Sequence, residues 1–129
     1  MMQTVATTAL WRRDDSDSPR FIRQLSQTTY QIMAPFGPLP DKNGAFMIKE
    51  AIISTDLIPK DDVRSMVKSA GMGLTEFLED PDYPTNLANL VFDTTWGYHE
   101  TKAFGSYQEA LAFLARRAAR ENTQVQNRV

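Results

Sequence analysis

The 129-residue sequence contains no cysteine and a single histidine, His99. The absence of cysteine excludes disulfide bonds, thiolate nucleophiles and cysteine-ligated zinc or iron–sulfur centres. A cysteine-free chain suits a reducing compartment, and we expect a cytoplasmic protein. The single histidine leaves few arrangements for nucleophilic catalysis, and we expect neither a metal site nor a bound cofactor.

Long apolar runs are also missing. No stretch of the sequence approaches the roughly eighteen apolar residues of a membrane-spanning helix. The N-terminal segment has no basic start, and its apolar run ends at Arg12, so we expect no secretory signal and no membrane association. The formal net charge of -2 and the pI of about 5.3 are too mild to indicate nucleic-acid binding by bulk charge.

The composition is typical of one globular domain, with 42% hydrophobic and 23% charged residues. Residues 1–18, rich in Thr, Ser and Asp, are predicted to form a flexible arm. Residues 19–120 are predicted to form the single domain, and the polar residues 121–129 a flexible tail. Trp11 is the exception in the arm, because it either docks on the domain or serves as a short linear motif for a partner.

Helix-start patterns occur at two places in the first half of the chain. Ser18 followed by Pro19 resembles an N-cap and a first helical residue, which predicts a helix over residues 19–27. After Pro59, apolar residues recur at helical spacing until Gly71, which predicts a second helix between them.

Two further helices are predicted downstream. A short helical segment is expected over residues 74–78. Ser106 and Glu109 form a capping box, and the apolar face that follows them predicts the last helix.

Strand patterns complete the predicted fold. The β-branched residues in segment 44–55 favour a strand. Residues 88–96 are predicted to be a strand, with residues 98–104 as its hairpin partner across Gly97. The sequence therefore predicts an α+β fold with a small antiparallel sheet packed by two or three helices. The alternative is an all-α fold, in which segments 44–53 and 85–92 are both helical.

Catalytic and metal sites find little support in the sequence. His99 and its neighbour Glu100 would point to opposite faces of a strand, and no G-x-S-x-G motif presents a serine. A small enzyme that uses His99 as acid or base therefore remains only an alternative hypothesis. The acidic residues from Glu76 to Asp82 do not match a calcium loop and are interpreted as solvated.

Protein binding is the favoured function, by elimination. The aromatic hairpin face, with Trp96, Tyr98 and His99, and the Met72 loop are the predicted contact residues. A small accessory or regulatory protein that binds another protein, or a second copy of itself, is the resulting hypothesis.

Nucleic-acid binding is the alternative from a different class. It would use the arginines of the last helix, Arg116, Arg117 and Arg120.

Overall fold

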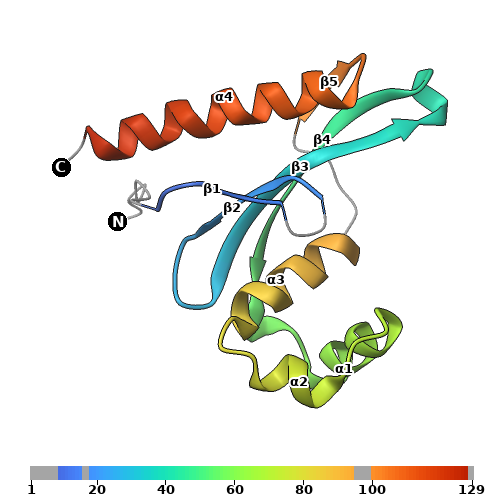
Figure 1. Cartoon of the computed structure of the whole chain (residues 1–129), viewed down its shortest axis with the longest axis vertical. Coiled ribbons are helices and arrows are strands. Elements are labelled where there is room, and N and C mark those ends of the chain that lie inside the picture. The colour runs from blue at the N-terminus through green and yellow to red at the C-terminus, as the bar shows by residue number, and fades with distance from the viewer. Residues whose placement is uncertain (1–8, 16–17, 95–99, 128–129) are drawn as a thin grey trace, which may run out of the picture.

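The computed structural model describes residues 9–15, 18–94 and 100–127 of the chain. In these residues the strands form one antiparallel sheet in the order β1-β2-β3-β4-β5 (Figure 1). The strands are β1 (Arg12–Asp14), β2 (Arg20–Gln24), β3 (Thr29–Leu39), β4 (Ala45–Ser54) and β5 (Glu100–Phe104). The helices are α1 (Lys60–Ser69), α2 (Leu74–Glu79), α3 (Tyr83–Thr94) and α4 (Tyr107–Gln126), with short 3-10 turns η1 (Pro40–Lys42) and η2 (Thr55–Leu57). The predicted α+β class is confirmed.

The sheet is covered by helices on both faces. Figure 1 shows α4 along one face and α1, α2 and α3 gathered against the other. Each face has its own apolar core. Ile22 and Ile32 belong to the core beneath α1–α3, whereas Met33 and Ile48 belong to the core beneath α4. Because successive side chains of a strand point to opposite faces, a strand buried on both sides reads as a continuous apolar run.

The predicted helix over residues 19–27 is wrong. The structure has strand β2 there, paired with both β1 and β3. Phe21 enters the core under α4 and Ile22 the core under α1–α3, so the segment needs the two-residue period of a strand. Pairing with two neighbours therefore overrides the local cap signal of Ser18 and Pro19.

The predicted pairing of strands 88–96 and 98–104 is wrong, although residues 100–104 of the second arm do form a strand; residues 95–99 lie outside the described part of the chain. Residues 83–94 form helix α3, and Leu87, Ala88, Val91 and Phe92 are its buried face. Strand β5 pairs with β4 instead, with Phe104 opposite Phe46. The strand predicted in segment 44–55 is confirmed as β4, and the helices predicted after Pro59, over 74–78 and after Ser106 are confirmed as α1, α2 and α4.

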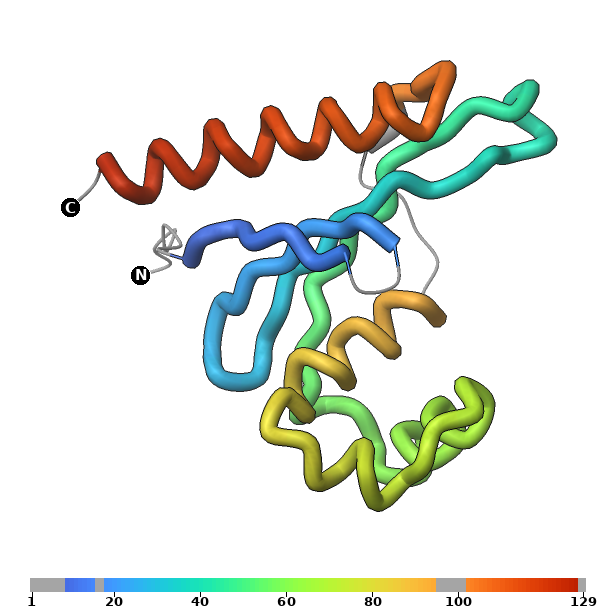
Figure 2. Tube along the Cα trace, in the orientation of Figure 1, coloured from blue at the N-terminus to red at the C-terminus, as the bar shows by residue number. Residues whose placement is uncertain are grey.

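Parts of both predicted end segments belong to elements of the fold. Strand β1 lies within residues 1–18, and helix α4 continues to Gln126. Figure 2 shows the N-terminal strand beside the C-terminal end of α4. Trp11 is buried there, and its backbone N–H donates to Asn122 Oδ1 at 2.7 Å. Of the two alternatives for Trp11, the structure shows docking on the domain.

Candidate functional site

Helix α3 has two different faces, and this difference creates the site. Its buried face packs on the sheet, as described above. Asn86, Asn89, Leu90 and Asp93, spaced i, i+3, i+4 and i+7, share another face. These residues line a groove of about 380 Å³. Helix α3 therefore supplies both part of the core and the floor of an open site.

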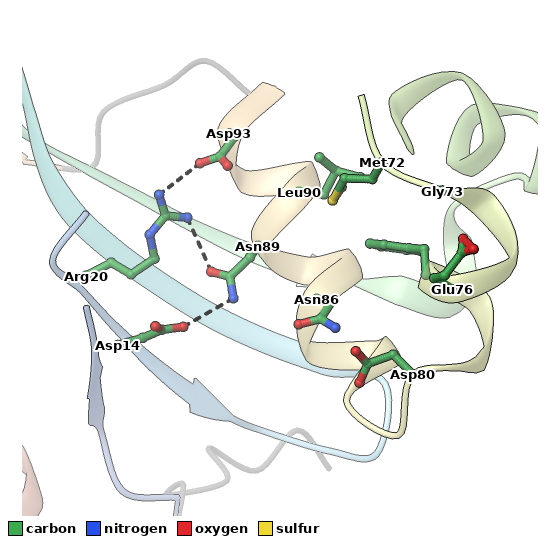
Figure 3. Close-up of a pocket in the computed structure, with 11 residues that line it drawn as sticks. Asp14, Arg20, Met72, Gly73, Glu76, Asp80, Asn86, Asn89, Leu90 and Asp93 are labelled. Atoms are coloured by element: carbon green, nitrogen blue, oxygen red, sulfur yellow. Dashed lines mark hydrogen bonds and ion pairs between the residues drawn. The ribbon is translucent and has the colours of Figure 1, made fainter. Parts of the chain in front are cut away.

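Two walls rise beside this floor (Figure 3). On one side, Asp14 at the end of β1 and Arg20 at the start of β2 line the groove. The opposite wall comes from α2 and the residues just before it and after it: Met72, Gly73, Glu76, Phe77 and Asp80. We call this site the α3 groove. Among the described residues, Met72 is the predicted contact residue that lies in it, and this residue is 42% exposed.

Arg20 fixes the strand wall to the floor. Its side chain is nearly buried, at 8% exposure of the residue, and one N–H donates to Asp93 Oδ1 at 2.9 Å. A second N–H donates to Asn89 Oδ1 at 3.2 Å, and the guanidinium carbon lies 5.2 Å from the centre of the Phe92 ring. Asn89 Nδ2 makes a longer contact of 3.5 Å with Asp14 Oδ2. These contacts hold β1, β2 and α3 in a fixed relation.

The polar groups on the α2 side are largely uncommitted. Within the residues described, Glu76 makes no hydrogen bond or ion pair, and neither does the side-chain amide of Asn86. Asp80 accepts one hydrogen bond, at 2.7 Å, from the backbone N–H of Asp82. A Cβ at position 73 would overlap the carboxylate of Glu76, so a larger residue there would require this exposed side chain to turn away. The α2 wall therefore offers carboxylates to a ligand, and the adjoining floor offers the amide of Asn86.

The charge and polarity of the α3 groove define the ligand it can hold. The lining includes four carboxylates, from Asp14, Glu76, Asp80 and Asp93, and one guanidinium, that of Arg20. Apolar surface separates the acidic groups. It comes from the side chains of Met72, Phe77 and Leu90. A long apolar stem that ends in a cation matches this combination.

Lys49, on β4, also contacts the ring of Phe92. Its ammonium nitrogen lies 4.6 Å from the centre of that ring and 5.7 Å from the centre of the Phe36 ring. Burial lowers the pKa of Lys49; the nearby Arg20 acts in the same direction, while Asp93 opposes it. No periodicity or motif in the sequence singles out this inward-pointing lysine.

The arginines proposed for nucleic-acid binding divide into two kinds. Arg116 and Arg120 are exposed on α4. Arg117 instead donates two hydrogen bonds of 2.8 Å to the two carboxylate oxygens of Glu50 on β4, and a third of 3.0 Å to Glu121. These hydrogen bonds raise the pKa of Arg117. Its guanidinium therefore joins α4 to the sheet.

The ion-pair network around Arg117 continues to the N-terminal segment. Gln31 donates to Glu50 Oε2 at 2.6 Å, and Arg23 donates to Gln31 at 2.8 Å. The guanidinium of Arg23 lies 4.3 Å from the centre of the Trp11 ring, whose N–H donates to Glu121 at 2.8 Å. The network thus fastens Trp11 to the sheet and to α4.

The other predicted contact residues, Trp96, Tyr98 and His99, lie outside the described part of the chain. Comparisons with protein-family models, with curated proteins and with solved structures gave no match. In the described ranges, no cluster of three histidine or carboxylate side chains is arranged to hold a metal ion. No helix in these ranges is long and apolar enough to cross a membrane.

Proposed function

We propose that this chain is a small non-catalytic accessory or regulatory protein that binds another protein by taking a lysine or arginine side chain into the α3 groove. The observation that carries the proposal is the combination of four carboxylates with an apolar lining in one groove of about 380 Å³. A cytoplasmic location accompanies the proposal, since the chain has no cysteine.

The groove matches a basic side chain in each of its parts. The methylene stem of lysine or arginine would cover the side chains of Met72 and Leu90, which removes apolar surface from water. The cationic end would meet Glu76 or Asp80, neither of which has a cationic partner in the described structure. A charge-assisted hydrogen bond to a carboxylate is stronger than one between neutral groups.

The floor of the groove adds a second kind of recognition. The side-chain amide of Asn86 carries both donors and an acceptor, so it can pair with the backbone of an extended segment. Arg20 and Asn89 are already bonded to each other, which keeps the floor in place before a ligand arrives. A groove that is formed in advance loses less conformational entropy on binding.

The nucleic-acid alternative receives less support from this geometry. Arg117 is committed to Glu50 and Glu121, which leaves Arg116 and Arg120 as exposed cations of the three. The groove itself has an acidic lining, which repels a phosphate backbone.

The test compares two variants that change the same charges at different places. Glu76→Gln with Asp80→Asn neutralises the α2 wall, whereas Glu79→Gln with Asp82→Asn neutralises exposed carboxylates outside the groove lining. Each protein carries a photo-crosslinking amino acid in place of Met72 and is incubated with nuclease-treated extract of the native cell. Crosslinked peptides are then identified by mass spectrometry.

We expect wild type and the control variant to crosslink the same partner peptide, which contains a lysine or arginine. The groove variant should lose that crosslink. Equal crosslinking by the groove variant, or a crosslinked peptide without a basic residue, would contradict the proposal.

A further inference from the structure

A second groove, of about 560 Å³, lies on the other side of α2. It lies among the turn between β2 and β3, η2, α1, α2 and the start of α3. The residues that line it are Gln27, Thr28, Thr55, Asp56, Ile58, Lys60, Val63, Arg64, Leu74, Leu78, Tyr83 and Pro84. We call it the α1 groove. It shares no lining residue with the α3 groove, so it is a separate site.

The α1 groove is apolar, and large apolar side chains at it are exposed. Ile58, Val63 and Leu74 line it, and Leu78 remains 49% exposed at its edge. Leu57, between two lining residues in the chain, is 75% exposed. Exposed large apolar side chains gathered at a groove are typical of a binding surface. An apolar side chain of a partner would cover them.

The charges at the α1 groove have the opposite balance to those of the α3 groove. Lys60 and Arg64 are four residues apart on α1 and therefore lie on the same side of the helix. Neither makes a hydrogen bond or an ion pair with a side chain in the described structure. Asp56 is the one acidic residue in the lining. The groove therefore favours an apolar side chain with a carboxylate beside it.

Helix α2 separates the two grooves. Its residues Glu76 and Phe77 face the α3 groove, while Leu74 and Leu78 face the α1 groove. A helix with its side chains is about 10–12 Å across, and an extended chain advances about 3.3–3.6 Å per residue. An extended segment that crosses α2 thus places side chains in both grooves when those side chains are about three to four residues apart.

We propose that one extended segment of the partner crosses α2, with its basic side chain in the α3 groove and an apolar side chain, next to an acidic one, in the α1 groove. The position of the basic side chain rests on the proposed function. The apolar and acidic preference comes independently from the lining of the α1 groove. The partner is thereby defined as a protein with a two-part motif, in which a basic residue lies about three to four residues from an apolar residue that has an acidic neighbour.

The test selects peptides from a random twelve-residue display library against the full chain. Affinities of the selected peptides are then measured for wild type, for Leu78→Ser and Arg64→Ser in the α1 groove, and for Glu76→Gln with Asp80→Asn in the α3 groove. Leu10→Ser is the matched control, because Leu10 has a similar exposure of 45% and lines neither groove. Leu78 and Arg64 are both exposed enough that their replacement should leave the fold intact.

We expect selected peptides to carry the two-part motif. Replacing the apolar residue of the peptide by alanine should weaken binding at least tenfold to wild type and to Leu10→Ser, but little to Leu78→Ser. Arg64→Ser should lose the preference for the acidic neighbour. Peptides that depend on their basic residue and on the carboxylates of Glu76 and Asp80, but not on an apolar residue or Leu78, would overturn this inference and leave the proposed function standing.

Peptides that depend on Leu78 but bind the variant Glu76→Gln with Asp80→Asn as tightly as wild type would refute the proposed function, and with it the single segment across α2. Failure to select any peptide would contradict both. The two-part motif thus stands only if both grooves contribute to the affinity of the same peptide.

Discussion

Replacing Glu50 by methionine while Arg117 remains in place should destabilise the fold by about 3–5 kcal/mol. The Glu50 side chain is only 9% exposed, and its carboxylate receives two hydrogen bonds of 2.8 Å from Arg117 and one of 2.6 Å from Gln31. Arg117 is itself only 21% exposed. The single substitution therefore leaves a partly buried guanidinium without its main counter-charge, which is the costly step.

The double variant, Glu50→Met with Arg117→Met, separates the effect of an unpaired guanidinium from the net contribution of the ion pair to stability. Methionine is long and apolar, so two methionines can fill much of the space between β4 and α4. Because no charge is then left without a partner, the double variant should lose less than the sum of the two single variants, by about 1–3 kcal/mol. Urea unfolding at pH 7, followed by circular dichroism, measures all three differences against wild type.

Additive effects, within about 0.5 kcal/mol, would refute this reasoning. So would an Arg117→Met variant as stable as wild type. In that case Arg117 would contribute nothing to the attachment of α4 to the sheet. It would then be available, with Arg116 and Arg120, for the nucleic-acid binding of the alternative hypothesis.

The remaining predictions concern packing and pH. Leu114→Ala should lower the free energy of unfolding by roughly 2–5 kcal/mol, because Leu114 is fully buried between α4 and the sheet. Ser106→Ala should lower it by about 1 kcal/mol, because the hydrogen bond of 3.1 Å from the Glu109 N–H is lost. Thermal unfolding of both variants measures the difference. Burial alone would raise the pKa of Glu121, but hydrogen bonds from its neighbours lower this pKa below 4.5. The ionised Glu121 therefore stabilises the folded state, and this stabilisation is lost as the pH falls below about 4.5. In Glu121→Gln, the urea midpoint should fall less steeply with decreasing pH in this range than in wild type. Burial lowers the pKa of Lys49 below 10.5, so the folded protein releases this proton at a lower pH than the unfolded chain does. The free energy of unfolding should therefore rise as the pH increases from the lowered pKa toward 10.5. Urea midpoints should show this rise in wild type and not in Lys49→Met.

Local signals in the sequence predicted the elements whose stability is local. The capping box at Ser106 was found because cap and helix are neighbours in the chain, and in the structure the Ser106 side chain accepts from the Glu109 N–H while the Glu109 carboxylate accepts from the Gly105 N–H. The segment after Ser18 was misassigned because its strand depends on pairing with β1 and β3. A short apolar segment does not show in its own sequence which strands it will pair with.

The candidate site depended still more on distant residues. Arg20 and Asp93 meet across a sequence separation of 73 residues, and Asn89 and Asp14 across 75. The loop position of Met72 indicates a contact residue, whereas the acidic residues from Glu76 to Asp82 resemble a solvated surface. The sequence favours a strand over residues 88–96, and only its all-α alternative has a helix over residues 85–92, so the favoured prediction gives Asn86 and Asp93 no common face. The groove appears only when α2, α3 and the first two strands are placed together.

The most direct test of the α3 groove is an NMR titration with a blocked arginine tripeptide, Gly-Arg-Gly, and its citrulline counterpart, which has nearly the same shape and no charge. The side-chain amides of Asn86 and Asn89 and the methyl group of Met72 report on the groove, and the side-chain amide of Asn122, bonded to Trp11, is the remote control. We predict saturable shifts of the three groove signals with the arginine peptide alone, weakened by salt and abolished by Glu76→Gln with Asp80→Asn. Equal shifts with the citrulline peptide, or no saturable shift of the groove signals, would contradict the claim that this groove binds a basic side chain.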